Sequence, residues 1–318
     1  MLKISVIIPA YNAEKTIRET IESVLKQTFS NFKIVIINDG SSDRTLDIIQ
    51  QIVDPRIQCF SYKNGGNSLA RNRGISHATG EFISFLDADD LWTPDKLELQ
   101  LAALQNSEAS VAYSWTTTFI DGQEKSVFPC TPIYFEGNVY DKLLVNNFIA
   151  NGSNILVRKK AIELVGGFEP TLKRCADWDF YIRLAAKCHF VVVPKHQIFY
   201  RRSSGSLSMN IKLVEQESIK VIEKAYQSAP PKYQFLKNQS LAWTYQYCTQ
   251  QYLRCSINIR EVMKASQKLW TAIRLYPPIL LEDYGRDLII WSIKKWILVF
   301  LGQAKVIKNR ILSFNRRG

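Results

Sequence analysis

Phe82-Ile83-Ser84-Phe85-Leu86-Asp87-Ala88-Asp89-Asp90 is the most informative stretch of this 318-residue sequence. Its apolar part is typical of a buried strand, and an acidic cluster follows where that strand ends. No basic residue stands within the cluster, so its carboxylates repel one another unless a cation joins them. Carboxylate oxygens bind Mg²⁺ and Mn²⁺, which proteins often share with substrate phosphates. The alternative is a solvated acidic turn in front of a helix, with Asp90 or Thr93 as its N-cap.

Three apolar runs precede this strand, and helical patterns lie between the four runs. The earlier runs are at 4–8, 34–37 and 57–60. Strands that are buried on both faces and alternate with helices predict an α/β fold with a doubly wound, mostly parallel sheet. Such sheets bind ligands at the carboxyl ends of their strands, so the residues just beyond these runs form the candidate site.

Aromatic, acidic and basic side chains stand beyond those strand ends. Tyr11 follows the first run, and its ring can stack on a nucleotide base. Asp39 follows the second run and can accept a hydrogen bond from a base N–H. Arg71 precedes the fourth run, and its planar guanidinium suits a diphosphate with a metal at Asp89 on the far side. Each residue alone has a plain structural explanation, but together on one edge they favour a binding site.

These motifs, in this order, resemble those of the inverting glycosyltransferases of family 2, whose nucleotide-binding domain has the GT-A fold. The resemblance covers roughly residues 1 to 210 and is specific for the family rather than for the sugar. It rests on 6–12 (VIIPAYN), 38–43 (NDGSSD), 70–74 (ARNRG), 85–90 (FLDADD), 165–168 (VGGF) and 177–179 (DWD).

The resemblance implies a nucleotide-diphosphate sugar donor, with UDP as the expected nucleotide, and Mn²⁺ or Mg²⁺ as cofactor. Its nucleotide-sugar-binding residues would be Pro9, Tyr11, Asp39, Arg71 and Asp87. Asp89 would hold the metal that bridges the diphosphate. Many relatives have a histidine near the position of Ser203, so a third protein ligand lacks support here. Arg201 or Arg202 would contact phosphate instead.

An acidic pair supplies the general base in this family, and 177–179 is its counterpart here. Ala176 stands where the first acid commonly lies, so Asp177 is the expected catalytic base. It would take the proton from the acceptor hydroxyl as that oxygen attacks the anomeric carbon. The alternative is that Asp177 or Asp179 only caps a helix.

The acceptor side is expected to include Gly167, Phe168 and Trp178. The two glycines before Phe168 permit a tight turn that could set the aromatic ring under the acceptor sugar. A plain turn followed by a core phenylalanine explains the same residues.

We expect two regions along the chain. Residues 1–213 would form the GT-A domain, with a donor half at about 1–110 and an acceptor half at about 111–213, and residues 214–318 a helical C-terminal region. Near the end, 288–301 is strongly apolar around Lys294 and Lys295, and no acidic residue follows Asp287. This composition is typical of a basic amphipathic helix at an anionic membrane surface. A helix docked on the protein, with solvated lysines, is the equal alternative.

The composition predicts a cytoplasmic protein with an anionic partner. The chain opens without a signal peptide, and no apolar stretch reaches the roughly 18 to 20 residues that cross a bilayer. Its six cysteines form no C-x-x-C pair, which fits a reducing compartment, and with the three histidines they show no zinc spacing. The net charge of +12 indicates nucleotide phosphates, nucleic acid or anionic lipid as the partner. With the resemblance, we expect a nucleotide sugar and no nucleic acid, and a tail that contacts the inner face of the membrane if it binds lipid.

We therefore expect a metal-dependent, inverting transferase of the hexosyltransferase type that acts in cell-surface polysaccharide synthesis on a glycan or lipid-linked acceptor. A catalytically inactive glycan-binding or scaffold relative is one alternative, which Ala176 and Ser203 allow. A nucleotidyltransferase that makes sugar nucleotides is another, although no glycine-rich Arg/Lys loop follows the first strand. A dehalogenase-type phosphatase would carry its D-x-D after the first strand, and P-loop chemistry is excluded because the chain has no G-x-x-x-x-G-K.

Overall fold

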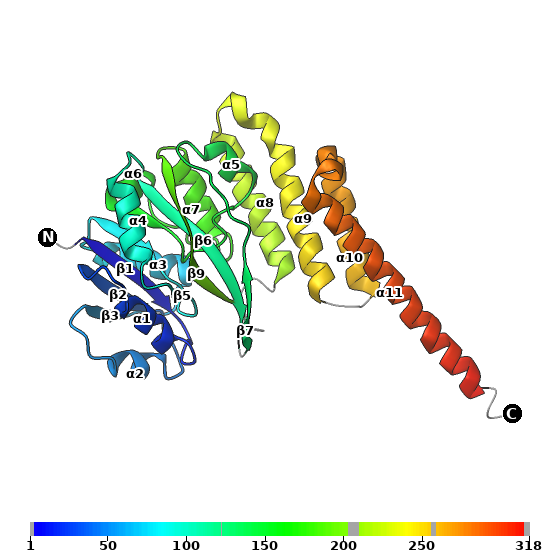
Figure 1. Cartoon of the computed structure of the whole chain (residues 1–318), viewed down its shortest axis with the longest axis horizontal. Coiled ribbons are helices and arrows are strands. Elements are labelled where there is room, and N and C mark those ends of the chain that lie inside the picture. The colour runs from blue at the N-terminus through cyan, green and yellow to red at the C-terminus, as the bar shows by residue number, and fades with distance from the viewer. Residues whose placement is uncertain (1–2, 122, 203–209, 256–258, 315–318) are drawn as a thin grey trace. The chain divides into compact units, whose positions relative to one another are not determined.

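The computed structural model describes residues 3–121, 123–202, 210–255 and 259–314 (Figure 1). The chain forms two compact units. The first consists of Met1–Leu143 with Asn147–Ser206, and the second of Leu144–Asn146 with Leu207–Gly318.

The first unit is an α/β domain built on a nine-stranded sheet. The strands are β1 (Ile4–Ala10), β2 (Phe32–Asn38), β3 (Ile57–Ser61), β4 (Phe82–Phe85), β5 (Leu91–Trp92), β6 (Val111–Ile120), β7 (Gln123–Pro129), β8 (Leu156–Arg158) and β9 (Phe190–Arg202). The helices between residues 17 and 185 are α1 (Ile17–Leu25), α2 (Thr45–Gln50), α3 (Asn67–His77), α4 (Lys96–Gln105), α5 (Tyr140–Val145), α6 (Lys159–Val165) and α7 (Ala176–Ala185). The four strands expected from the apolar runs are all present.

The strand order is β3-β2-β1-β4-β8-β6-β9-β5, with β7 paired to β6. Strands β1 to β4 pair with one another in parallel, as the sequence predicts. Beyond them the sheet is more mixed than expected, because β8 runs antiparallel to both β4 and β6. Since β9 is parallel to β6, strands β1, β2, β4, β6 and β9 all point the same way. Their carboxyl ends therefore lie at one edge of the sheet, and β8 begins at that same edge.

Helices cover both faces of the sheet. Alternate residues of a strand point to opposite faces, and Ile4, Val6 and Ile8 of β1 share one core with apolar residues of α1, α2 and α4. On the other face α3 packs against β1 and β2. There the Phe85 ring of β4 meets the Phe180 ring of α7, with 6.2 Å between ring centroids. Both faces of the sheet are thus buried. The edge formed by the carboxyl ends of the strands is therefore the part of the sheet where a site is expected.

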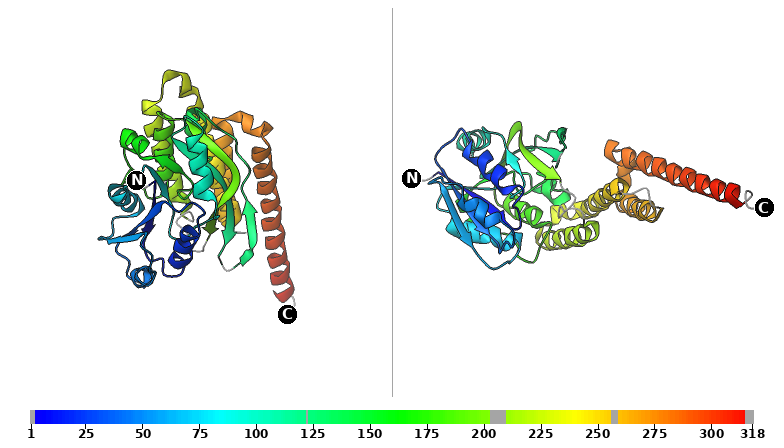
Figure 2. Two further views of the ribbon diagram at one scale, coloured as in Figure 1. Left: turned by 60° about the vertical axis from the view of Figure 1, so that its left-hand side comes forward. Right: turned by 90° about the horizontal axis from the view of Figure 1, so that it is seen from below.

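The second unit is helical. It contains α8 (Ile211–Ser228), η2 (Pro231–Leu236), α9 (Lys237–Cys255), α10 (Ile259–Leu275), η3 (Pro277–Leu281) and α11 (Asp283–Phe314). One buried cluster joins Leu253 of α9, Ala265 and Leu269 of α10, and Leu288 of α11. The last helix, α11, is a single 32-residue element, drawn from orange to red in Figure 2. Within the described ranges, no helix combines the length and the apolar character that crossing a bilayer requires.

Candidate active site

The acidic loop after β4 receives a basic partner from α3. Arg71 Nη2 donates to Asp87 Oδ1 at 2.5 Å, and the guanidinium also lies over the Phe168 ring, 5.0 Å from its centroid. Arg71 is almost fully buried. A Cβ at Gly152 would lie 2.2 Å from Arg71 Nη2, so only glycine leaves room for the guanidinium there. The arginine expected to face a diphosphate therefore holds Asp87 in place.

Asp90, the last residue of the cluster, is locked inside the protein. Its Oδ2 accepts a 2.5 Å hydrogen bond from Ser153 Oγ, and its Oδ1 accepts from the Arg201 N–H at 2.9 Å. Ser153 Oγ in turn accepts from the Asp87 N–H at 3.0 Å. Because its side chain is wholly buried and bonded to protein, Asp90 fixes the shape of the loop.

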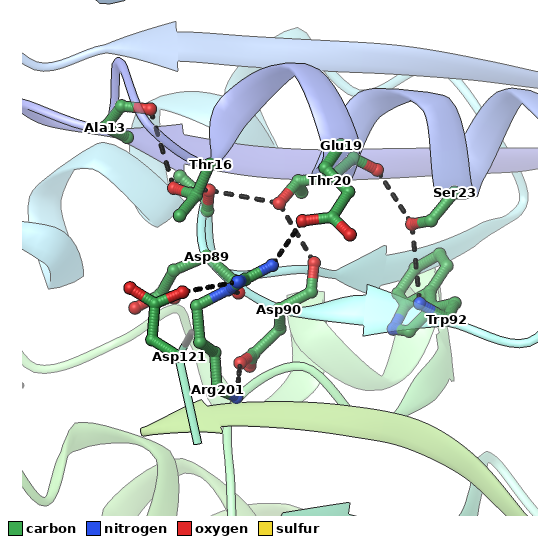
Figure 3. Close-up of polar contacts among 11 residues, drawn as sticks. Ala13, Thr16, Glu19, Thr20, Ser23, Asp89, Asp90, Trp92, Asp121 and Arg201 are labelled. Atoms are coloured by element: carbon green, nitrogen blue, oxygen red, sulfur yellow. Dashed lines mark hydrogen bonds and ion pairs between the residues drawn. The ribbon is translucent and has the colours of Figure 1, made fainter. Parts of the chain in front are cut away.

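Arg201, at the end of β9, completes this network (Figure 3). Its Nε donates to the Asp89 carbonyl at 2.8 Å, and its Nη1 donates to Asp121 Oδ1 at 2.9 Å. Its Nη2 donates to Glu19 Oε2 of α1. From the sequence we expected Arg201 or Arg202 to contact a phosphate. In the structure, all three guanidinium nitrogens of Arg201 donate hydrogen bonds to the protein. Ser203, two residues later, lies outside the described residues.

Among the residues that the structure describes, none donates a side-chain hydrogen bond to the Asp89 carboxylate. Burial raises the pKa of Asp89 to about 6, the neighbouring Asp87 charge adds to the rise, and Arg201 opposes it. Among the described side chains, no three of His, Cys, Asp and Glu are grouped closely enough to hold a metal ion. A metal at Asp89 would thus draw its other oxygen ligands from a substrate diphosphate or water, as Mg²⁺ sites commonly do. The crowded negative charge at Asp89 fits a divalent cation.

Asp177, in the first turn of α7, lies close enough to Arg71 and Asp87 to sense both charges. Its Oδ1 accepts from the Trp178 N–H at 2.9 Å and its Oδ2 from Asn147 Nδ2 at 3.1 Å. Burial raises the pKa of Asp177 to about 6, and Asp87 contributes to the rise while Arg71 opposes it. A half-buried carboxylate whose pKa lies near neutrality is suited to proton transfer.

Asp179, two residues later, is held by a different set of contacts. It is almost fully buried, and its Oδ2 accepts from Arg183 Nε at 2.8 Å. Arg183 also donates to the carbonyls of Val165 and Gly167, at 2.8 and 2.7 Å. The Asp179–Arg183 pair therefore ties α7 to the turn before Phe168.

That turn is clamped from α3 as well. Asn72 Nδ2 donates to the Phe168 carbonyl at 2.8 Å, and Asn72 Oδ1 accepts from the Phe168 N–H at 2.7 Å. A Cβ at Gly167 would lie 2.3 Å from Asn72 Oδ1, which explains why glycine stands there. Gly167 thus serves this clamp.

Two of the residues expected at the acceptor side belong to the core. Phe168 is buried against the rings of Phe85 and Phe180, with centroid separations of 5.0 and 4.4 Å. Trp178 is also buried, and its Nε1 donates to the Leu143 carbonyl at 2.7 Å. The Phe168 ring fills the space between the sheet and α7, which agrees with the alternative of a core phenylalanine. A role for Phe168 under an acceptor sugar stays a prediction.

A family model for "Glycosyltransferase like family 2" matches residues 5–252, which is most of the chain. The chain belongs to this glycosyltransferase-like family 2. Its family model spans every motif quoted above, and the resemblance recognised in the sequence is confirmed.

Two curated relatives each match less than half of the family 2 chain. The putative teichuronic acid biosynthesis glycosyltransferase TuaG of Bacillus subtilis is 39% identical over 152 residues, which cover 46% of this chain and 58% of TuaG. The Escherichia coli protein named UDP-Glc:alpha-D-GlcNAc-diphosphoundecaprenol beta-1,3-glucosyltransferase WfgD is 40% identical over 111 residues, 35% of this chain and 44% of WfgD. The chain thus spans little more than half the length of TuaG and less than half that of WfgD.

Solved structures of similar fold cover nearly the whole family 2 chain. TarS of S. aureus, residues 1–349 with UDP-GlcNAc, superposes with a TM-score of 0.61 at 20% identity, covering 95% of this chain and 92% of that one. The mannosyltransferase PcManGT of Pyrobaculum calidifontis, with GDP-Man and Mn²⁺, has a TM-score of 0.60 at 16% identity, covering 94% and 87%. These likenesses confirm the expected GT-A fold.

The residues expected to bind the nucleotide base lie in two loops of this family 2 chain. Tyr11 is 54% exposed beside Asn12, whose Oδ1 accepts from the Ser42 N–H at 2.8 Å. Pro9 is buried within β1. Tyr11 thus remains open for stacking.

Asp39 is engaged by its own protein. Its carboxylate accepts from the N–H groups of Gly65 and Gly66, at 3.0 and 2.8 Å, and from Arg73 Nη1 at 2.8 Å. Contact between the Asp39 carboxylate and a base would require this loop to yield one of those bonds. Arg73, which also lies over the Tyr62 ring, is a site residue that sequence reasoning missed.

The segment 147–154 was also missed. Asn147 contacts Asp177, Gly152 admits Arg71, and Ser153 binds Asp90, so this one segment touches both acidic regions. It reaches this edge because β8, which it precedes, runs opposite to β4. Its polar run Asn151-Gly152-Ser153-Asn154, directly before an apolar strand, was the available signal.

Proposed function

We propose that this chain is an inverting, metal-dependent glycosyltransferase that moves a sugar from a nucleotide-diphosphate sugar, UDP most of all, to a glycan or lipid-linked acceptor. The observation that carries the proposal is Asp177, a half-buried carboxylate of raised pKa beside the Arg71–Asp87 pair at the carboxyl edge of the sheet. In this proposal, Asp177 would act as the base next to the acidic loop where a donor diphosphate would lie.

The donor is assigned to the loops after β1, β2 and β4. Tyr11 is free to stack on the base, and Asp39 and Arg73 line the neighbouring loop. Asp87, held by Arg71, would orient the ribose and diphosphate. The complex of TarS with UDP-GlcNAc and the UDP-Glc donor in the name of WfgD support a UDP-linked donor.

In the proposed reaction the acceptor hydroxyl attacks the anomeric carbon of the donor. The proton of that hydroxyl passes to Asp177, a new bond forms between the acceptor oxygen and the anomeric carbon, and the bond to the diphosphate breaks. The electron pair of that bond leaves with the nucleoside diphosphate. A single displacement from the opposite side inverts the anomeric carbon and needs one base, which is what the site offers.

Asp89 would hold Mn²⁺ or Mg²⁺ together with the donor. A bound divalent cation would supply Lewis-acid stabilisation of the charge that develops on the leaving diphosphate. The crowded charge that raises the pKa of Asp89 is the structural support for this assignment. The structure of PcManGT with GDP-Man and Mn²⁺ also supports a divalent cation at this site.

We assign residues 1–213 to the transferase domain, with donor and acceptor halves that meet near residue 110, and residues 214–318 to a helical region. Within the acceptor half, the loops around Asp177 are assigned to acceptor binding. The names of WfgD and TuaG, one with a diphosphoundecaprenol substrate and one in teichuronic acid biosynthesis, support cell-surface polysaccharide synthesis on a glycan or lipid-linked acceptor.

A donor screen tests the proposal. Purified full-length protein is incubated with UDP- and GDP-sugars and Mn²⁺, and release of the nucleoside diphosphate is measured with and without undecaprenyl-diphosphate sugars. We expect turnover with one donor that disappears in Asp177→Asn. Binding of glycans without turnover of any donor would instead support the scaffold alternative, and formation of a sugar nucleotide from a nucleoside triphosphate would support the nucleotidyltransferase.

A further inference from the structure

The last helix of the chain, α11, has two unlike faces. Leu288, Ser292 and Val299 are buried in the second unit, and Trp296 Nε1 donates to Ser266 Oγ of α10 at 2.9 Å. Residues four and seven apart lie on the same side of a helix. This inner face anchors α11, so the first part of the tail is integrated in its unit.

The opposite face of α11 is apolar and exposed. Six large apolar side chains there are between 49% and 63% exposed. They are Ile290, Ile293, Ile297, Leu298, Phe300 and Leu301. The spacing of positions 290, 293, 297 and 301 gathers them on one side of the helix, with Lys294 among them. We call these six residues and Lys294 the outer face.

Charge identifies what this outer face would meet. From residue 288 to the end, the sequence has seven basic residues and no acidic one. They are Lys294, Lys295, Lys305, Lys308, Arg310, Arg316 and Arg317. A second copy would bring seven further positive charges against them, which opposes self-association through this face. An anionic lipid surface offers the complementary charge and accepts the apolar side chains at its headgroup boundary.

We infer that α11 is an interfacial membrane-binding helix whose outer face enters the headgroup region of an anionic lipid surface. The helix lies along the surface and does not cross it, in keeping with its lysines and with the arc of apolar residues on one side only. The inference concerns lipid binding and stands independently of sugar transfer. If sugar transfer also holds, a lipid surface is where a lipid-linked acceptor resides.

Vesicle co-sedimentation of the full-length protein tests this inference. One vesicle contains phosphatidylglycerol and the other only phosphatidylcholine, both at low salt. We expect strong binding to the first, weak binding to the second, and loss of binding as salt is raised. The double variant Ile293→Glu with Ile297→Glu should lose at least about tenfold in binding to the anionic vesicle.

Two further variants distinguish an effect on the lipid-binding surface from an effect on the fold. Met263→Glu with Trp270→Glu places the same two charges on exposed apolar residues of α10, and we expect this variant to bind vesicles like the unaltered protein. Lys294→Gln with Lys295→Gln leaves every apolar contact in place and should weaken anionic binding by about fivefold per lysine. Thermal melting of each variant, read by circular dichroism, reports the fold separately.

The inference is overturned if the protein ignores anionic vesicles, binds both vesicles equally, or binds as before in the outer-face variants. It is also overturned if ultracentrifugation shows a dimer that Ile293→Glu with Ile297→Glu dissociates, because a second copy then covers the face. Calorimetry with UDP is run on the same samples, so that failure of donor binding and failure of lipid binding are recorded apart.

Discussion

The two acidic segments of the site, 87–90 after β4 and 177–179 at the start of α7, divide their carboxylates in the same way. In each, one carboxylate is buried and bonded to arginine and neighbouring groups: Asp90 to Ser153 and Arg201, Asp179 to Arg183. In each, another carboxylate is only half-buried and has its pKa raised to about 6, namely Asp89 and Asp177. Complete burial raises the pKa of Asp90 as well, so the two kinds of carboxylate differ in access rather than in the direction of the pKa shift.

The comparison teaches that neighbouring acids of one motif do separate work. A carboxylate whose bonds are satisfied by protein stabilises the fold, and removal of its partner is costly. A half-buried carboxylate of raised pKa can still be reached by a proton or a cation, and accepting either one offsets the free-energy cost of its burial. Substitutions within each segment should therefore give opposite kinds of damage.

The largest effect is expected at Asp177. Asp177→Asn keeps the shape of the side chain but cannot accept a proton, so turnover should fall by roughly two to four orders of magnitude with donor affinity nearly unchanged. Initial rates at saturating donor measure it. Asp179→Asn is the matched control; if it lowers turnover per folded molecule as much while Asp177→Asn does not, the roles are reversed.

Asp179→Ala should instead damage the fold. It leaves Arg183 without its carboxylate in a buried setting, and such losses cost on the order of 3 kcal/mol, about a hundredfold in the folding equilibrium. Urea unfolding of Asp179→Ala and Asp177→Asn side by side measures the difference. Equal midpoints in the two variants would break the comparison.

Asp89→Asn should weaken donor binding. With the proposed metal ligand neutralised, the Mn²⁺-dependent affinity for UDP should fall by roughly 10- to 100-fold. Calorimetry with UDP, with and without Mn²⁺, measures this, and EDTA should bring the unaltered protein to the level of the variant. Full UDP affinity in EDTA would contradict a metal bridge.

Turnover should depend on pH through Asp177. Because its pKa is raised to about 6 by burial, it is deprotonated and able to accept a proton at pH 7, and protonated as pH falls below 6. At pH 5 about a tenth of the molecules carry the active carboxylate, so turnover at saturating donor should be about tenfold lower than at pH 7. The residual turnover of Asp177→Asn should not show this decrease between pH 7 and pH 5. Measurement of turnover against pH for both proteins checks it.

The smallest effect is expected at Asn147. Asn147→Ala removes one of the two hydrogen bonds that orient the Asp177 carboxylate and should lower turnover by about tenfold or less, with the donor KM unchanged. Steady-state kinetics with donor and acceptor varied separately measures it. Loss of stability without change in turnover per folded molecule would assign Asn147 to the fold alone.

The parallel half of the sheet could be predicted because its strands are continuous apolar runs. The run at 57–60 became β3 at Ile57–Ser61, and that at 82–86 became β4 at Phe82–Phe85. The reversed direction of β8, only three residues long, carries no such pattern. For the same reason the segment 147–154 could not be predicted to reach the site, because its position depends on where β8 begins.

Within the site, Asp177 and Asp89 could be named from sequence because of the motif each stands in. Their contacts could not be named, since Arg201, which donates to the Asp89 carbonyl, lies 112 residues away and only tertiary structure brings the two together. The burial of Phe168 could not be decided from sequence for a related reason: its sequence neighbours permit a turn, but packing against the rings of Phe85 and Phe180 decides where the side chain goes.

The same separation has a consequence for how the chain matures. The N-terminal strands can pair as soon as they leave the ribosome, yet the acidic loop is closed by the backbone of Arg201, 111 residues after Asp90. At synthesis rates of about 5 to 20 residues per second, that interval lasts roughly 6 to 22 seconds. During it, Asp90 lacks its hydrogen bond from the Arg201 N–H. The four parallel strands are thus synthesised before the strand that closes the acidic loop, and synthesis of β9 supplies the last contact that the candidate site needs.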